Sequence, residues 1–459
     1  MKYLLKNGTV VSGTEAKKLD VLVEDEKITK VGEALSNPEA KVIDVTGKLL
    51  FPGFIDGHTH FDLEVAGTVT ADDFETGTQA AILGGTTLVI DFASQDKGGH
   101  SLKEGLEKWH KKADGKCSCD YSFHMSIVEW NEETKKEIQD MIDEGITSFK
   151  LYMTYPAMIV DDEDLYKIIK ELGEKGCFAG VHCENAGVIN ALIQEAKEQG
   201  RFGPENHPLV RPDTMEAEAV HRLLVIAREA DAPVMVVHLT NRKAYEEILR
   251  ARENGQTVFA ETCPQYLLLD DSVYSKPDFE GAKYVCAPPI RKKEDQDCLW
   301  KALANGDIQT VATDQCSFTL AQKALGKEDF TKIPGGLPGV QTRGTLLYTY
   351  GVRTGKISVE KMCQLLCENP AKLYGVYPDK GVIREGSDAD IVVFDPEKES
   401  VISARTHAYN TDNNPYEGFK LHGDIDKVFL RGNLAVEDGK LVREKLGTYI
   451  KRGKRQPLG

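Results

Sequence analysis

Several features that mark other protein classes are missing from this sequence of 459 residues. No apolar run approaches the roughly 18 residues of a membrane span, and the first residues, MKYLLKNGTVVSG, contain no long apolar signal region. Basic side chains are outnumbered, since 57 Lys and Arg stand against 73 Asp and Glu, for a formal net charge of -16. We therefore expect a cytoplasmic protein that binds neither membranes nor nucleic acids.

The cysteines lack the spacing of a disulfide scaffold or a zinc finger. Ten are scattered along the chain, several of them within apolar runs. The two closest pairs, Cys117 with Cys119 and Cys363 with Cys367, have neither the CxxC form nor a second half-site. We expect most of the cysteines to be reduced and buried.

The pattern of apolar and polar residues changes clearly after about residue 50. Residues 1–50 hold alternating runs such as DVLVEDEKITKV, broken by Gly and Asn, which predict short antiparallel strands. A similar alternation returns beyond about residue 376, in SDADIVVFDP and DKVFLRGNLAVEDGKLV. We expect 1–50 and 376–459 to pair into one small, discontinuous β-sandwich domain.

Between these flanks, residues 51–375 alternate apolar β-branched runs with amphipathic stretches of helical period. Stretches such as DEDLYKIIKELGEKG carry apolar residues at i, i+3 or i+4. The strand-like runs number eight: KLLFPGFIDGHTH, TTLVIDFAS, YSFHMSIV, ITSFKLYM, CFAGVHCEN, APVMVVHLT, TVFAETCPQYL and QTVATDQCS. Eight strand-helix units predict a (β/α)8 TIM barrel, an α/β fold whose active site lies at the carboxyl ends of the strands.

Candidate ligand side chains stand at the ends of several of these runs. HTH ends the first run, and imidazoles spaced i, i+2 lie on the same side of an extended chain, although two ordinary histidines closing a buried strand fit the tripeptide equally well. In a barrel, the carboxyl ends of all strands meet at one rim. We therefore expect six side chains to converge there: His58, His60, Lys150, His182, His238 and Asp314.

Four imidazoles and one carboxylate in this set suit borderline divalent ions such as zinc. The set is large enough for two ions but offers no obvious bridging group. Lys150 is cationic near neutral pH and cannot ligate a metal in that form. Its carbamate, formed with carbon dioxide, would be an anion able to bridge both ions; the residues permit this modification without requiring it.

Seven motifs, taken in order, resemble those of one enzyme family. They are FPGFIDGHTHFD, SFKLYMTYPAMIVDD, VHCEN, VVHLTN, ETCPQYLLLD, APPIR and VATDQCSF. Together they resemble the cyclic amidohydrolases of the dihydropyrimidinase and D-hydantoinase group, within the amidohydrolase superfamily. The resemblance runs from the first barrel strand to about residue 440, and the order of the motifs makes it specific.

This resemblance implies two zinc ions in each subunit. One ion would be held by three side chains, His58, His60 and Asp314. The other would be held by His182 and His238. N6-carboxylated Lys150 and a hydroxide would bridge the two ions, and would thus supply the bridging group that the unmodified side chains lack.

The resemblance also implies a reaction on a small cyclic ureide or imide. The hydroxide would attack a ring carbonyl, Tyr155 would hydrogen-bond the developing oxyanion, and Asp314 would carry the proton to the departing ring nitrogen. Main-chain groups at Ala287 and Gly335 would hold the amide edge of the ring. Opening a 5,6-dihydropyrimidine or a 5-substituted hydantoin, phenylhydantoin included, would yield an N-carbamoyl amino acid. The resemblance further implies a homotetramer, with barrel helices and the basic tail KRGKRQPLG as contacts.

Related activities remain as alternatives. Dihydroorotase resembles this scheme but carries an Arg just after HxH, where Phe61 and Asp62 stand here, so an anionic substrate is disfavoured. Allantoinase is the main alternative, and a non-enzymatic scaffold of this fold would have lost ligands that all persist here. The chain departs from the family pattern at four positions, which leaves the shape of the substrate slot open: Cys183, Ala287, Gln315 and Gly335.

Overall fold

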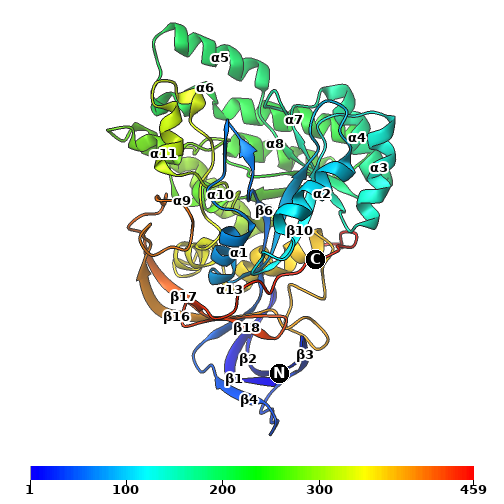
Figure 1. Cartoon of the computed structure of the whole chain (residues 1–459), viewed down its shortest axis with the longest axis vertical. Helices are drawn as coiled ribbons and strands as arrows, with labels where there is room; N and C mark the ends of the chain where they lie inside the picture. Colours follow the sequence, from blue (N-terminus) through cyan, green and yellow to red (C-terminus); the bar gives the residue numbers. More distant parts are fainter. Residues whose placement is uncertain (1, 459) are drawn as a thin grey trace.

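The computed structural model describes residues 2–458, and in Figure 1 a barrel lies above a smaller sheet. All eight predicted barrel strands are present and pair side by side in chain order. They are β6 (Phe54–Thr59), β9 (Thr86–Ser94), β10 (Asp120–Ser126), β11 (Ser148–Tyr152), β12 (Phe178–His182), β13 (Val234–Val236), β14 (Val258–Thr262) and β15 (Thr310–Val311). A parallel bridge between Thr59 and Gln315 brings the chain beyond β15 back to β6. The predicted (β/α)8 barrel is therefore confirmed.

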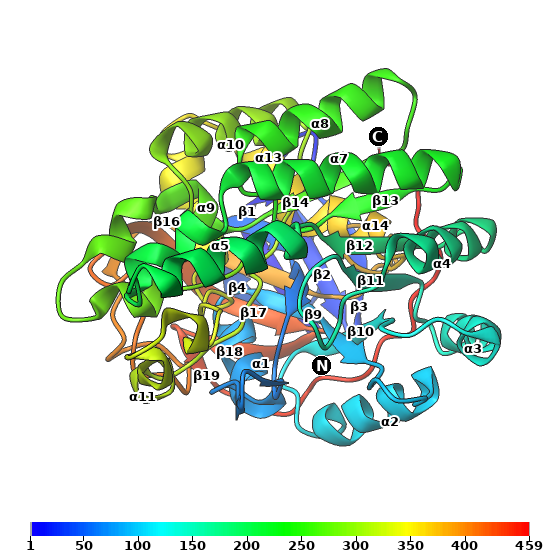
Figure 2. The same ribbon diagram turned by 90° about the horizontal axis from the view of Figure 1, so that it is seen from above.

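Helices surround the barrel strands, as Figure 2 shows from above. The longer helices are α1 (Phe74–Leu83), α2 (Leu102–Ala113), α3 (Glu132–Asp143), α4 (Asp162–Glu174), α5 (Ala186–Glu198), α7 (Asp213–Glu229), α8 (Arg242–Glu253) and α10 (Lys293–Asn305). The shorter ones are α6 (His207–Val210), α9 (Pro264–Leu268), α11 (Leu320–Lys323), α12 (Arg343–Leu347), α13 (Val359–Cys363) and α14 (Asn369–Leu373). None of the helices within 2–458 combines the length and the apolar composition of a membrane span.

Local chemistry explains where these helices begin and which face they bury. The α4 segment, for example, starts after Asp161, whose carboxylate accepts a hydrogen bond from the backbone N–H of Asp164. Its buried residues Leu165, Ile168 and Leu172 are spaced by three and four, which places them on one face against the barrel. The helical periods in the sequence therefore correspond to real apolar stripes.

The two chain ends form a separate sheet, as expected. Its nine strands are β1 (Lys2–Val11), β2 (Ala16–Glu24), β3 (Lys27–Gly32), β4 (Lys41–Asp44), β5 (Leu49–Pro52), β16 (Ile391–Val401), β17 (Lys420–Leu430), β18 (Asn433–Glu437) and β19 (Lys440–Leu441). Antiparallel pairing of β5 with β16 joins the amino-terminal and carboxyl-terminal parts. The expectation of short antiparallel strands is wrong in part, because β1 has ten residues and pairs in parallel with both β4 and β5.

The small sheet leads directly into the barrel. Only Gly53 separates β5 from β6, and a Cβ at this position would lie 2.0 Å from the Thr87 hydroxyl oxygen, so a larger residue would clash. The amino-terminal end of β6 therefore lies beside the small sheet. His58 and His60 lie toward the other end of β6, because a strand rises about 3.3 Å per residue.

Side chains fill the barrel interior below the rim. Ile55, Phe178 and Met235 pack there against Leu373, the last residue of α14, and Tyr374, which follows it. The interior of the barrel below the rim is therefore a packed core.

The basic tail contacts this same barrel. Arg452 is buried and donates hydrogen bonds to the hydroxyls of Ser122 and Ser148, while the Gly453 carbonyl accepts one from Thr147. Thr147 immediately precedes β11, so the tail covers the end of the barrel opposite the rim. Arg452 and Gly453 of the tail are thus used in contacts within their own chain.

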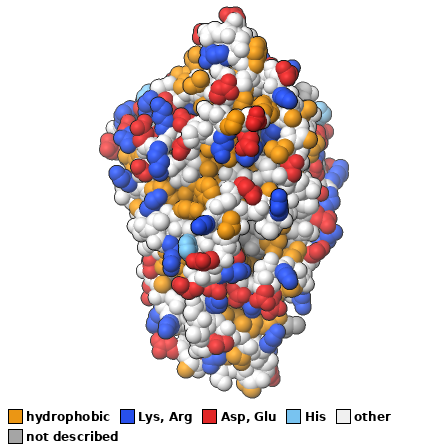
Figure 3. All heavy atoms as spheres, turned by 90° about the vertical axis from the view of Figure 1, so that its left-hand side faces the viewer, with side chains coloured by type: hydrophobic (Ala, Val, Ile, Leu, Met, Phe, Trp, Pro, Cys, Tyr) orange, Lys and Arg blue, Asp and Glu red, His pale blue; other side chains and the backbone are white. Residues whose placement is uncertain are grey.

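Charges of both signs are interspersed over the face drawn in Figure 3, so that face carries no continuous basic stripe. The cysteine expectation is confirmed. All ten are free, and every one except the half-buried Cys298 is buried.

Candidate metal centre

The six predicted ligand positions lie at the upper rim of the barrel. His58 belongs to β6 and His60 follows it, Lys150 lies in β11, and His182 is the last residue of β12. His238 lies two residues beyond β13, and Asp314 lies three residues beyond β15. Sequence reasoning placed these last two inside strand runs, whereas the strands stop earlier and both side chains stand on the loops that leave the barrel.

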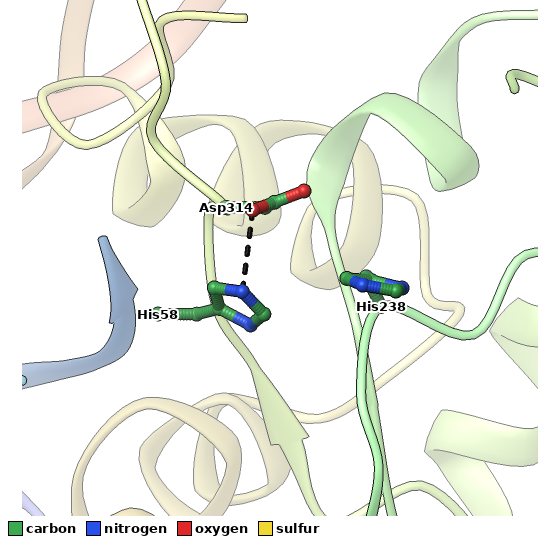
Figure 4. Close-up of side chains that lie close together, drawn as sticks. All are labelled: His58, His238 and Asp314. Atoms are coloured by element: carbon green, nitrogen blue, oxygen red, sulfur yellow. Dashed lines mark ion pairs between the residues drawn. The ribbon is translucent and has the colours of Figure 1, made fainter. Parts of the chain in front are cut away.

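Three of the side chains form a compact group, drawn in Figure 4. The candidate ligand atoms of His58, His238 and Asp314 all lie within 4.8 Å of one another. Asp314 Oδ1 is 3.2 Å from His58 Nε2 and 3.1 Å from His60 Nε2. One carboxylate oxygen of Asp314 thus faces both imidazoles of the HTH motif, so His58, His60 and Asp314 converge on one point.

The remaining candidates extend this group across the barrel. The ring of His182 lies 4.6 Å from that of His238 and 5.0 Å from that of Tyr155, measured between centroids. Lys150 is only 1% exposed, and its ammonium lies 5.0 Å from the centre of the Phe92 ring. Burial holds the pKa of His238 well below its ordinary value, and the nearby His182 and Lys150 lower it further.

The electrostatics of Lys150 and Asp314 differ in a chemically useful way. Burial lowers the pKa of Lys150 to about 8, against the opposing effect of Asp314 and Glu261. A neutral amine, the form that reacts with carbon dioxide, is therefore far more accessible than for an ordinary lysine. Burial acts to raise the pKa of Asp314, but the hydrogen bond from His60 and the nearby positive groups outweigh it and hold the pKa near 2. Asp314 is thus ionised at neutral pH.

Two imidazole nitrogens are buried without a hydrogen-bond partner among the described residues, His58 Nε2 and His238 Nδ1. Such groups are costly to bury unless something binds them. Burial holds the pKa of both rings well below the ordinary value, so the rings are neutral and offer lone pairs. The donor set therefore fits a divalent metal such as zinc.

Carboxylates behind two of the histidines fix their orientation. Glu261 Oε1 lies 2.6 Å from His58 Nδ1, and Glu184 Oε2 lies 2.6 Å from His182 Nε2. Arg211 in turn donates two hydrogen bonds to Glu184. A carboxylate on one imidazole nitrogen leaves the other nitrogen free for a metal, which is the usual arrangement around metal-bound histidines.

Glu261 was not singled out from the sequence. It lies in the apolar run TVFAETCPQYL, within β14, and is buried at 1% exposure. An acidic residue inside a buried strand is rare without a partner, and this signal could have identified it.

Three predicted site residues have strained backbones. Tyr155, His238 and Asp314 have φ angles of 68°, 39° and 53°, in the left-handed region that non-glycine residues seldom adopt. Each costs of order 1–3 kcal/mol, and such residues cluster at functional sites. The surrounding structure therefore holds these side chains in position at a cost to stability.

The two predicted main-chain binding positions lie side by side. A Cβ on Gly335 would lie 3.8 Å from Cys286 Cα and 3.9 Å from Ala287 N, which is ordinary contact. Gly335 is exposed and Ala287 half-buried, while the residues on either side of each are buried. Ala287 and Gly335 are thus each more exposed to solvent than the residues on either side of them.

Comparison with known proteins gives a consistent result. The Amidohydrolase family profile matches residues 49–435. The chain is 46% identical to a D-hydantoinase of Geobacillus stearothermophilus over 99% of this chain and 97% of the relative. It is 43% identical to a D-hydantoinase of Streptomyces coelicolor over 100% of this chain and 99% of the relative. The crystal structure of dihydropyrimidinase from Brevibacillus agri superposes with a TM-score of 0.98 at 44% identity, covering 100% of both chains. The resemblance read from the seven motifs is confirmed, and this chain belongs to the amidohydrolase family.

Proposed function

We propose that this protein is a hydrolase that opens the ring of a 5,6-dihydropyrimidine or a 5-substituted hydantoin, phenylhydantoin included, to an N-carbamoyl amino acid. One observation carries the proposal: the six ligand-type side chains converge on one rim in a chain that matches D-hydantoinases over its whole length. The apolar side chains of Leu63, Met158 and Ile159 would border the substituent of the ring.

The metal site of the proposal uses all six side chains. His58, His60 and Asp314 would hold one zinc ion, and His182 with His238 would hold the second. N6-carboxylated Lys150 and a hydroxide would bridge them. When bound, the two ions would supply Lewis-acid polarisation and a nucleophilic hydroxide near neutral pH. His58 Nε2 and His238 Nδ1, which are buried and make no hydrogen bond to the described residues, support this assignment.

The protein groups have separate tasks in the reaction. Main-chain groups of Ala287 and Gly335 hold the amide edge of the ring. Asp314, ionised and directed at the HTH imidazoles, accepts the proton of the nucleophile and delivers it to the departing ring nitrogen. The Tyr155 hydroxyl donates a hydrogen bond to the oxyanion that forms at the attacked carbonyl. Burial raises the pKa of Tyr155 far above its ordinary value, so this hydroxyl stays protonated.

A rate comparison tests the proposed function. We expect zinc-loaded protein to open dihydrouracil and phenylhydantoin with higher kcat/KM than allantoin or dihydroorotate. Turnover of allantoin alone would replace the proposal by allantoinase. A native protein that binds no metal and opens none of the four rings would identify a non-enzymatic scaffold.

Replacement of Tyr155 by phenylalanine tests the oxyanion contact. One hydrogen-bond donor to an oxyanion contributes roughly 3 to 4 kcal/mol in other hydrolases, so we expect kcat to fall by about 10²-fold to 10³-fold. KM should change little, because the contact forms only in the transition state. Steady-state kinetics measures both, and Tyr166→Phe on the neighbouring helix α4 serves as the control. A fall of less than threefold in kcat would remove Tyr155 from this role.

We also propose a cytoplasmic homotetramer. The ten free cysteines suit a reducing compartment. Several apolar side chains are exposed around α5 and α6, among them Val188, Phe202 and Leu209. These residues suit an interface on the barrel helices. Sedimentation equilibrium of the purified protein should give four times the chain mass; a monomer would refute the assembly.

A further inference from the structure

A buried lysine connects the two loops that carry Ala287 and Gly335. Lys323, the last residue of α11, is 2% exposed. Its ammonium donates hydrogen bonds to the backbone carbonyls of Val285, Pro334 and Gly336, at 2.9, 2.8 and 2.9 Å. No ion pair with Lys323 occurs among residues 2–458, so backbone carbonyls are its hydrogen-bond partners. A charge buried in this way is expensive, which calls for a role beyond local packing.

A buried histidine makes the corresponding contact on the other loop. His207 Nε2 lies 2.7 Å from the carbonyl oxygen of Cys286. Burial and the charge of Arg211 lower the pKa of His207 to about 3, so the ring is neutral. Because a carbonyl can only accept, Nε2 carries the proton and donates it.

These two contacts set the direction of the next N–H group on each loop. The Cys286–Ala287 and Pro334–Gly335 peptide bonds are trans, so the C=O and N–H of each point in opposite directions. The N–H of Ala287 therefore points away from His207, and that of Gly335 points away from Lys323. Neither N–H donates a hydrogen bond to any other residue of the described chain.

Both N–H groups belong to the exposed parts of their loops. Ala287 is half-buried and Gly335 exposed, and the two loops are held together by a hydrogen bond from Gly336 N–H to the Val285 carbonyl. The unpaired donors therefore lie on adjacent, braced backbone segments beside the rim. Two neighbouring free donors of this kind suit carbonyl oxygens on one edge of a flat ring.

We propose that His207 and Lys323 are positioning residues, which aim the N–H groups of Ala287 and Gly335 at the carbonyl groups of the ring substrate. This inference rests on the proposed function, because it takes the substrate to be a cyclic ureide. His207 and Lys323 need not touch the substrate themselves. They orient and polarise the peptide groups that do, which reduces the entropy lost on binding.

Single substitutions in the zinc-loaded full chain test these roles. His207→Leu and Lys323→Met remove the donors, and we expect each to raise KM about tenfold, the value of one well-made hydrogen bond. The kcat should stay within about twofold, because the contact is made equally in the ground and transition states. His207→Gln keeps a donor near the Nε2 position and should restore KM. Lys327→Met, at an exposed lysine four residues further on, is the matched control.

Metal content and melting temperature are measured for every variant, so that a KM change is read only in folded, fully loaded protein. If Lys323→Met does not fold, the His207→Leu and His207→Gln pair decides, since it alters a single hydrogen bond. An unchanged KM in His207→Leu, or a His207→Gln variant as impaired as His207→Leu, would overturn the inference while wild-type turnover still supports the proposed function. Wild-type protein that opens no cyclic ureide would refute the proposed function and the positioning roles together.

Discussion

Lys150→Ala is expected to lose bound metal and activity together. The substitution removes the only side chain proposed to bridge the two ions. Metal ions in hydrolases supply several kcal/mol of transition-state stabilisation, so kcat should fall by about 10³-fold or more. Elemental analysis should show fewer than two zinc ions per chain in the variant and two in the wild type. A variant that retains both ions and its activity would contradict the bridging role.

Dependence on carbon dioxide distinguishes a carboxylated lysine from an ordinary one. Apo-protein reloaded with zinc in buffer free of carbon dioxide should recover little activity, and added bicarbonate should restore it. Because the pKa of Lys150 is about 8, its neutral amine is accessible at mildly alkaline pH. Activity should therefore recover faster at pH 8 than at pH 6. Lys150→Ala should not respond to bicarbonate at either pH. Equal recovery of the wild type with and without bicarbonate would show that the carbamate is not needed.

Asp314→Asn is expected to separate proton transfer from metal binding. Asparagine keeps an oxygen at the same position but cannot accept a proton, and a positioned base typically contributes 10²-fold to 10⁴-fold. We expect kcat to fall by about this factor while much of the bound zinc remains. Steady-state kinetics with metal analysis of the same sample measures both quantities.

The matched control for Asp314→Asn is Asp297→Asn, on the exposed surface of α10, which should behave as the wild type. Asp314→Asn protein that keeps both ions and more than a tenth of wild-type kcat would exclude Asp314 as the proton carrier. Loss of all metal would instead indicate that Asp314 acts chiefly as a metal ligand, consistent with its contacts to His58 and His60.

The barrel was predictable because its signals are local. Each strand is a short apolar run bounded by polar or turn residues, and each helix repeats its apolar residues at three and four positions. Lys150 and His182 stand within such strands, so their direction and height in the barrel follow from the strand itself. His238 and Asp314 leave the strands and adopt left-handed backbone conformations, which local propensity does not predict.

The supporting residues were harder to find for a different reason. Glu261, His207 and Lys323 acquire their roles from partners outside their own helix or strand: His58, Cys286 and the backbone carbonyls of three loop residues. A lysine in LAQKALG has the sequence character of an exposed helical residue, and only the fold around it buries it. Hydrogen bonds to backbone carbonyls leave no trace in the identity of the residue that accepts them.

The sequence by itself determined the barrel, the separate sheet from the two chain ends, the family, and the six side chains that meet at the rim. It did so because periodicity and motif order depend on near neighbours, and because a barrel gathers strand ends in a known way. Tertiary structure alone decided which carboxylates orient the histidines, which loops stand side by side, and where the basic tail lies. Most of these features depend on contacts between segments that are separate along the chain, such as Glu261 with His58 and Arg452 with Ser122, and only packing brings those segments together.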